Sequence, residues 1–245
     1  MALQRGAAGV TDSSDCGATR SRSYRSRHRN TRRNTVNAVD QPRIRAAVSE
    51  ILAALGADPQ APHLAQTPER VAAAYAEWCS GVGVDPHQIL LQSIAAECPT
   101  GDLVGVRDVE FTALCEHHLL PFHGKAHIAY LPGEKIVGLG ALARVTQALA
   151  ARPQLQERLG AELAGAIHTA LSTRGTLVVL EARHGCLSDR GPKQLAARAL
   201  TIAAEGELRT GALRDAALAL LTRHDRGVEL GTIADSDTTA ERADD

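Results

Sequence analysis

The chain has 245 residues, of which 44% are hydrophobic and 22% charged, and its formal net charge is -1. This composition is that of an ordinary globular protein, and the near-neutral charge excludes a general electrostatic attraction to nucleic acid or to membrane surfaces. The five cysteines are irregularly spaced, which argues against a disulfide framework and for a reducing compartment. No apolar run is long enough to span a bilayer and no signal-peptide pattern is present, so the sequence predicts a soluble cytoplasmic protein.

The two ends of the chain differ in composition from its middle. Residues 1–40 include the stretch TRSRSYRSRHRNTRRN, which is rich in Arg, Ser and Asn and nearly free of apolar residues. Such a segment buries too little apolar surface to offset the entropy lost on ordering, so we predict a disordered basic tail. A targeting or nucleic-acid-binding role for this tail is the alternative. Residues 232–245 are predicted to form a disordered acidic tail, which leaves one folded domain over residues 41–231.

The first part of the folded region is predicted to be helical. Residues 41–55 (QPRIRAAVSEILAAL) have apolar side chains at helical spacing, and Gly56 ends the pattern. Residues 67–79 begin with Thr67 as the N-cap and Pro68 in the first turn. Two helices therefore precede the first predicted strand.

A helix pair lies between two strand pairs in the rest of the domain. The predicted elements are strands at 103–114 and 125–132, helices near 140–151 and 152–171, strands at 175–186 and 199–208, and a helix at 210–222. Pro153 is expected at the start of the second of these helices. In the first of these strands, the alternation of apolar and polar residues does not show which side faces the core. This order predicts an α+β fold with an antiparallel sheet that is covered on one face.

The stretch ALCEHHLLPFHGKAHIAYLP, at residues 113–132, contains one cysteine and four histidines. Cys115 and His118 are three residues apart, and zinc prefers such thiolate and imidazole ligands when the chain turns between them. His184 and Cys186 lie at the end of the third predicted strand. Together with His117, these residues are five candidates for at most four ligand positions.

Two interpretations of these candidates remain open from the residues alone. Two predicted helices separate the two groups, whereas structural zinc sites usually have short loops, so three protein ligands and one open position would fit a catalytic site. Two histidines would then be left for proton transfer. The alternative is that Cys186 is a buried thiol and His184 a hydrogen-bonded strand histidine.

The motifs resemble those of the GTP cyclohydrolase I family, zinc enzymes that start pterin and folate synthesis. The resemblance covers residues 67–206 and is carried by CEHHLLPFHGKAHIAYLP, GL with LARV, RPQLQERL, and HGC with the following RG, in the family's order and spacing. It implies the tunnelling fold, a four-stranded antiparallel sheet with a helix pair between strands 2 and 3, N-terminal helices and a C-terminal helix. It also implies a homodecamer of two pentamers, with sites at subunit interfaces.

The resemblance further implies an activity, the Zn²⁺-dependent hydrolysis of GTP to 7,8-dihydroneopterin triphosphate and formate, the first step of pterin and tetrahydrofolate biosynthesis. Carried over residue by residue, it assigns the zinc ligands Cys115, His118 and Cys186, the proton-transfer residues His117 and His184, the guanine contacts Gln156 and Glu157, and the triphosphate contacts Arg70, Arg144 and Arg190.

The chain departs from the family pattern at the phosphate end of the expected site. Gly140 and Ala141 stand where the family has serine and lysine, and Asp189 is adjacent to Arg190, which it could neutralise. We therefore expect weakened triphosphate binding. The rival hypotheses are a divergent paralogue that retains zinc with altered phosphate recognition or low activity, and a non-catalytic zinc-stabilised binding protein. His117 and His184 argue against the latter, since a structural zinc does not need them.

Overall fold

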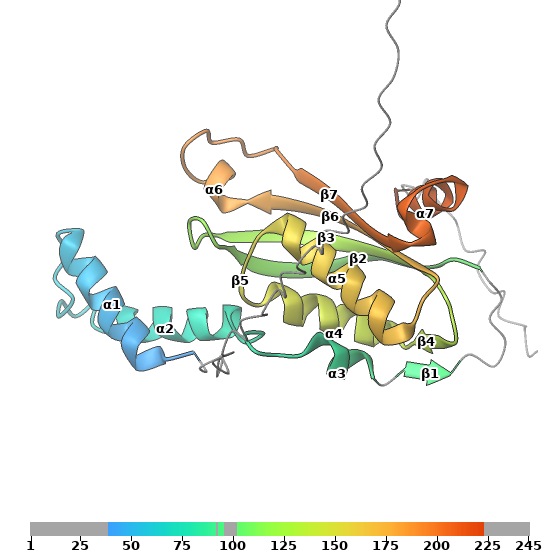
Figure 1. Ribbon diagram of the computed structural model, residues 1–245. Coiled ribbons are helices and arrows are strands. Elements are labelled where there is room, and N and C mark those ends of the chain that lie inside the picture. Colours follow the sequence, from blue (N-terminus) through green and yellow to red (C-terminus); the bar gives the residue numbers. More distant parts are fainter. Residues whose placement is uncertain (1–38, 92, 96–101, 223–245) are drawn as a thin grey trace, which may run out of the picture. The chain divides into compact units, whose positions relative to one another are not determined.

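The structure is a computed structural model that describes residues 39–91, 93–95 and 102–222 (Figure 1). The predicted acidic tail lies outside these residues, as does the predicted basic tail apart from its last two residues. In chain order the elements are α1 (Gln41–Ala54), α2 (Thr67–Trp78), α3 (Pro86–Leu90), β1 (Ser93–Ala95), β2 (Val104–Cys115), β3 (Pro121–Leu131), β4 (Lys135–Val137), α4 (Leu139–Ala150), β5 (Pro153–Gln154), α5 (Gln156–Leu171), β6 (Gly175–His184), α6 (Gly185–Ser188), β7 (Ala199–Gly206), the 3-10 helix η1 (Glu207–Arg209) and α7 (Ala212–Thr222).

The main sheet has five strands in the order β5-β2-β3-β6-β7. Strands β2, β3, β6 and β7 are antiparallel, and the pair α4 and α5 lies between β3 and β6 in the sequence, which confirms the predicted α+β fold. The predicted strand count and purely antiparallel arrangement are wrong, because the two-residue β5 pairs parallel to β2. A separate two-stranded sheet, β1 with β4, was not predicted either.

The short strand β5 changes where the following helix begins. Pro153 lies in β5 beside Leu114 instead of starting the helix. The backbone carbonyl of Gln154 accepts the N–H of Glu116 at 3.1 Å, so this part of the chain is bonded to the end of β2. Helix α5 then starts at Gln156, with Leu155 as an extended N-cap.

A bulge in β2 explains why the alternation of apolar and polar residues did not show which side of this strand faces the core. The pairing register of β2 with β3 shifts between Val106 and Val109, and Asp108 has a φ of 59°. One extra residue reverses the parity of the alternation. Val104 and Val106 therefore pack against the same core cluster as Val109 and Phe111.

Helices cover both faces of the sheet, but unequally. The main core forms between one face and the helices α4 and α5 (Figure 1), and includes buried residues such as Phe122, Leu142, Leu163 and Leu180. A smaller cluster on the other face includes Leu177 and, from α7, Ala217 and Leu221. The expectation of a sheet covered on one face is therefore incomplete, because α7 shields part of the second face.

Helix α2 is attached to the end of the sheet that carries the CEHH motif. The Tyr75 hydroxyl donates to the carbonyl of Leu119 at 3.4 Å, and the N–H of Gly81 donates to the carbonyl of Ala151 at 2.8 Å. The helix has Gln66 as its N-cap rather than the predicted Thr67, which is its first helical residue. In the described part of the chain, no helix has the length and apolarity needed to cross a membrane.

Candidate active site

The CEHH motif forms a tight turn between β2 and β3. Strand β2 ends at Cys115, and the carbonyl of Cys115 accepts the N–H of His118 at 3.2 Å and that of Leu119 at 2.7 Å. The Cys115 N–H donates to the carbonyl of Leu120 at 2.9 Å, which closes the turn. This local folding brings Nδ1 of His118 to 3.9 Å from Sγ of Cys115.

The end of β6 supplies a third side chain to the same place. His184 is the last residue of β6, and Gly185 leads the chain into α6, which carries Cys186. A Cβ atom at Gly185 would lie 2.9 Å from the carbonyl oxygen of Pro121, so this close approach requires glycine. The potential ligand atoms of Cys115, His118 and Cys186, hereafter the Cys-His-Cys group, all lie within 4.8 Å of one another.

The chemistry of this group fits a borderline-soft cation such as zinc. Two thiols and one imidazole are ligands that zinc prefers, and three protein ligands leave a coordination position open. Burial and the neighbouring Cys115 raise the pKa of the Cys186 thiol, whereas Arg190 acts in the opposite direction. A bound cation would favour the thiolates that this crowding disfavours. No other such group is found among the residues that the structure describes.

His184 is not a member of the Cys-His-Cys group and is held by two neighbours. Its ring stacks on Phe122, with centroids 4.5 Å apart and an interplanar angle of 4°. Its Nε2 atom lies 2.7 Å from Oε1 of Gln156. Burial lowers the pKa of His184, and the carboxylate of Glu157 acts to raise it. The structure therefore brings His184, Gln156 and Glu157 into one neighbourhood.

The Gln156 side chain, predicted to contact guanine, is engaged with the protein. Its Nε2 atom donates to the backbone carbonyls of Leu180 at 3.1 Å and Ala199 at 3.0 Å. Because these two partners only accept, the amide nitrogen is identified, and Oε1 must be the acceptor for Nε2–H of His184. Gln156 is thus a buried residue that orients His184.

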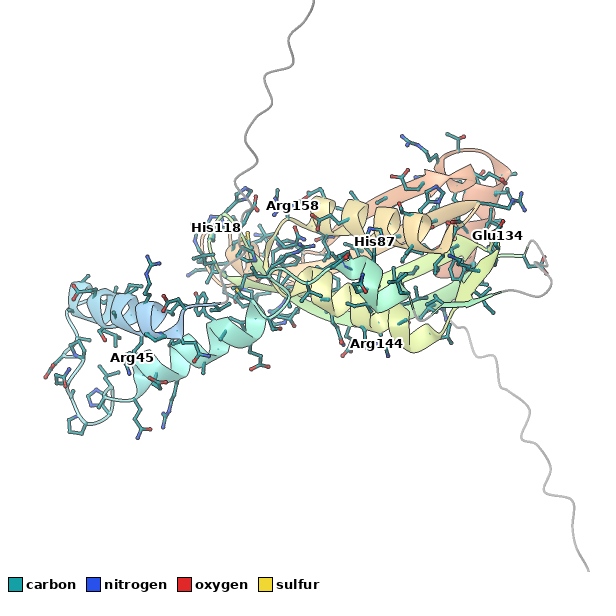
Figure 2. The ribbon with its side chains drawn as sticks, turned by 60° about the horizontal axis from the view of Figure 1, so that its bottom comes forward. Arg45, His87, His118, Glu134, Arg144 and Arg158 are labelled. Atoms are coloured by element: carbon teal, nitrogen blue, oxygen red, sulfur yellow. The ribbon has the colours of Figure 1, made fainter. Side chains whose placement is uncertain are left out.

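The remaining predicted site residues are exposed. His117 lies beside His118 in the turn, with ring centroids 6.3 Å apart, and Glu157 is in the first turn of α5. Arg190 is close enough to Cys186 to affect its pKa. Arg144 extends from α4 (Figure 2) and Arg70 from α2, where it donates to Gln66 at 2.7 Å. Among the described residues, no hydrogen bond or ion pair joins either arginine to the Cys-His-Cys group.

The positions that depart from the family pattern lie in different surroundings. Ala141 is only 3% exposed and packs in the main core, whereas Gly140 lies on the exposed side of α4. Asp189 accepts a hydrogen bond from the Ser188 hydroxyl and has Arg183 at 4.0 Å. The partners of the Asp189 carboxylate are thus Ser188 and Arg183, and its expected effect on Arg190 stays a prediction.

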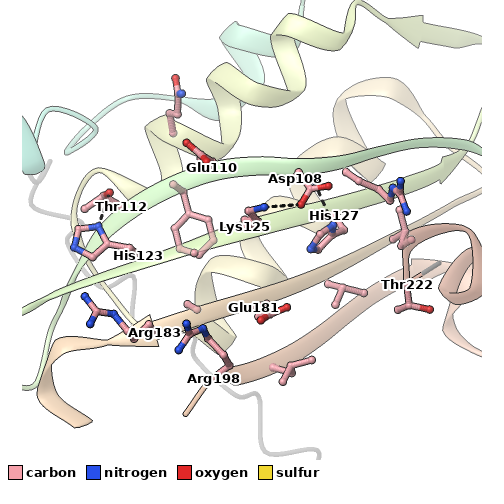
Figure 3. A pocket seen from close by; sticks show the side chains of 18 residues that line it. Asp108, Glu110, Thr112, His123, Lys125, His127, Glu181, Arg183, Arg198 and Thr222 are labelled. Atoms are coloured by element: carbon pink, nitrogen blue, oxygen red, sulfur yellow. Dashed lines mark hydrogen bonds and ion pairs between the residues drawn. The ribbon is translucent and has the colours of Figure 1, made fainter. Parts of the chain in front are cut away.

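The other two histidines of the CEHH stretch face a cavity of about 1240 Å³ over the opposite face of the sheet (Figure 3). Nδ1 of His123 lies 3.0 Å from the Thr112 hydroxyl, and Nδ1 of His127 accepts the N–H of Asp108 at 3.3 Å. Lys125 lies between them in the sequence and binds Asp108 at 2.9 Å. Both histidines therefore bond residues of β2, and neither belongs to the Cys-His-Cys group.

An open three-ligand group with a held imidazole beside it is the arrangement of a metal-dependent enzyme. Residues 44–222 match the family model of GTP cyclohydrolase I. The chain is 50% identical to GTP cyclohydrolase 1 of Leifsonia xyli subsp. xyli over 182 residues, which are 74% of this chain and 95% of the relative. It is 49% identical to that of Rhodopirellula baltica over 174 residues (71% and 75%), and 45% identical to that of Carboxydothermus hydrogenoformans over 185 residues (75% and 95%). The chain belongs to the GTP cyclohydrolase I family.

Proposed function

We propose that this chain hydrolyses GTP to 7,8-dihydroneopterin triphosphate and formate, with Zn²⁺ held by Cys115, His118 and Cys186. Family membership supports the reaction, and the observation that carries the metal assignment is the convergence of three ligand atoms within 4.8 Å. When bound, zinc would supply a water of lowered pKa for hydrolysis near neutral pH.

His184 and His117 are the proposed proton-transfer residues. The hydrogen bond from Nε2–H to Gln156 orients the His184 ring and leaves Nδ1 as the basic atom of its neutral form. Stacking on Phe122 further restricts rotation of this ring. The exposed His117 is free of the packing that restrains His184, so it can follow the reacting group as the purine ring opens.

Substrate recognition is assigned to the exposed residues around this centre. The Glu157 carboxylate can accept from both N1–H and the 2-amino group of guanine, a pair of donors that adenine lacks. Arg70, Arg144 and Arg190 would bind the triphosphate through charge-assisted hydrogen bonds. Gln156 contributes by holding His184, and a direct guanine contact would require it to exchange its present partners.

We also propose a cytoplasmic homodecamer with the tunnelling fold. Strand β7 is an edge of the main sheet, and it exposes Leu200 (67%) and Ile202 (49%). Joining sheet edges in a closed ring would remove the unpaired backbone groups that edges otherwise present. The free thiols of Cys79, Cys115 and Cys186 suit a reducing compartment.

The activity is tested by incubating purified, zinc-loaded protein with GTP. Formate release and, after oxidation, pterin fluorescence should appear together and in equal amounts. Glu157→Gln is the specificity control, because it removes the charge that accepts both guanine donors while leaving the Cys-His-Cys group in place. Zinc-loaded wild-type protein that releases neither product would contradict the proposed activity.

A further inference from the structure

A charged residue of the CEHH motif has no role in the proposed chemistry. Glu116 lies between the proposed ligand Cys115 and His117, and its carboxylate forms an ion pair with Nη2 of Arg158, in the first turn of α5. The backbone N–H of Glu116 donates to the carbonyl of Gln154 at 3.1 Å. The turn that carries His118 is therefore tied to β5 and α5 at two points.

Gln154 bonds the same arginine, so that Glu116, Arg158 and Gln154 form one connected set of contacts. Its Oε1 atom accepts from Nε of Arg158 at 2.7 Å, so the guanidinium bonds Gln154 and Glu116 at the same time. Gln154 itself is only 1% exposed, and its Nε2 atom donates to Glu162 at 3.0 Å and to the carbonyl of Leu149 at 3.2 Å. A partly exposed arginine is thereby fixed by a buried amide.

From this geometry we propose that Arg158 is a positioning residue that holds the metal-binding turn through Glu116 and Gln154. The proposal rests on the proposed metal site. The Arg158 side chain also connects the CEHH turn to the first turn of α5, which carries Gln156 and Glu157. One side chain thus fixes the position of the proposed metal ligands relative to the residues that hold His184 and guanine.

The physical reason lies in the turn itself. His118 is exposed and belongs to a short loop, so packing does little to hold its imidazole near Cys115. Polar partners that orient metal ligands typically change metal affinity by about 10–100-fold when they are removed. Arginine suits this task because its planar fork bonds two groups in fixed directions, which lysine cannot do.

The test is zinc affinity, measured on the full chain by competition with a chelator. Arg158→Gln and Glu116→Gln should each weaken zinc binding by about 10–100-fold, and the double variant should lose little more, because both remove the same contact. Arg158→Lys should recover only part of the affinity. Arg174→Gln is the matched control, since Arg174 makes a similar two-point ion pair with Glu207 and precedes β6, at the opposite end of that strand from Cys186.

Cobalt substitution provides a readout that simple destabilisation would not change. The absorption bands of the Co²⁺-loaded protein report the ligand geometry, and we expect them to shift in Arg158→Gln but not in Arg174→Gln. Zinc affinity and cobalt spectra of Arg158→Gln that match those of wild type would overturn the positioning role alone. Wild-type protein that binds no zinc would instead overturn the metal site on which the role depends.

Discussion

Nε2 of His184 lies 2.7 Å from Oε1 of Gln156, and the amide nitrogen of Gln156 is fixed by the carbonyls of Leu180 and Ala199. The imidazole proposed for proton transfer is thereby oriented by backbone groups of two neighbouring strands, β6 and β7. Two roles of Gln156, orientation of His184 and direct contact with guanine, predict different effects on kcat and KM.

We predict that Gln156→Met lowers kcat with little change in the KM for GTP. Methionine keeps the volume of the side chain but cannot accept from His184, so the ring loses its orientation while the guanine contact through Glu157 remains. The substitution also leaves the buried carbonyls of Leu180 and Ala199 without their amide donor, which costs about 1–3 kcal/mol, so the free energy of unfolding should fall. Steady-state kinetics and chemical denaturation measure the two effects. A raised KM with unchanged kcat would assign Gln156 to substrate binding instead.

Metal content should separate the proposed zinc ligands from the proposed proton-transfer residues. Cys115→Ser and Cys186→Ser are expected to lose zinc and activity together, because a hydroxyl is a poor zinc ligand at neutral pH. His117→Ala and His184→Ala should keep about one zinc per chain and lose turnover. Elemental analysis after dialysis, alongside activity, is the measurement. A zinc-free His184→Ala protein together with zinc-loaded Cys186→Ser would reverse the assignment.

The sequence predicted the main elements because their apolar periodicity matches the packing. The predicted strands 175–186 and 199–208 contain β6 and β7, but each extends two residues too far, into α6 and η1. In β6 the run TLVVL is buried on both faces of the sheet, by the main core on one face and the smaller cluster on the other. The sequence could not predict β5, because proline suits both the first turn of a helix and a strand edge, and only the pairing with Leu114 decides between them.

The residues of the Cys-His-Cys group were predictable by motif, but their supporting residues were not. Cys115, His118 and Cys186 appear in recognisable spacing, and the structure brings them together. Nothing in the local sequence indicates that Gln156 is buried or that Arg158 bonds Gln154 and Glu116, because these contacts depend on how β5 and α5 meet the turn. The bulge at Asp108 is hidden in the same way, by a strand pairing of distant residues.

The stability of the protein should decrease on mild acidification in a way that depends on His127. Burial lowers the pKa of His127, and Asp108 and Glu181 only partly oppose this shift. The unfolded chain therefore binds a proton more readily, and the contribution of His127 is present above its unfolded pKa of about 6.5 and declines as pH falls below it. The carboxylate of Asp108 has a lowered pKa, owing first to Lys125, so it titrates in a more acidic range.

His127→Gln is the variant that checks this dependence. Its amide oxygen can still accept the N–H of Asp108, but it does not titrate. Denaturation midpoints from about pH 7.5 to about pH 5.5 should fall less for the variant than for wild type. Parallel pH profiles for the two proteins would show that His127 does not contribute.

The oligomeric state should depend on the exposed apolar residues of β7. Light scattering of wild-type protein should report a large homo-oligomer, and Leu200→Lys should weaken it by placing a charge at the edge strand. Leu195→Lys is a matched control, because Leu195 is also 67% exposed but precedes the strand. A stable wild-type monomer at working concentration would contradict the proposed ring.

The last prediction concerns the serine and lysine that the family pattern places at positions 140 and 141. Ala141 packs in the core at 3% exposure, so a lysine there must displace apolar neighbours or extend past them, and we expect Ala141→Lys to lower stability. Position 140 is different. A Cβ at Gly140 would lie 3.3 Å from Nη1 of Arg144, the flexible end of a side chain that can shift.

Gly140→Ser should therefore place a hydroxyl beside a proposed phosphate ligand without disturbing the core. A hydrogen bond to a charged phosphate contributes about 1.5–3 kcal/mol, which corresponds to about tenfold or more in affinity. We expect a lower KM for GTP and an unchanged kcat, because the triphosphate is remote from the bonds that react and is bound equally in the transition state. Gly165→Ser, which adds the same hydroxyl in open space on α5, should leave both constants unchanged. An equal KM in wild type and Gly140→Ser would place the triphosphate away from Arg144.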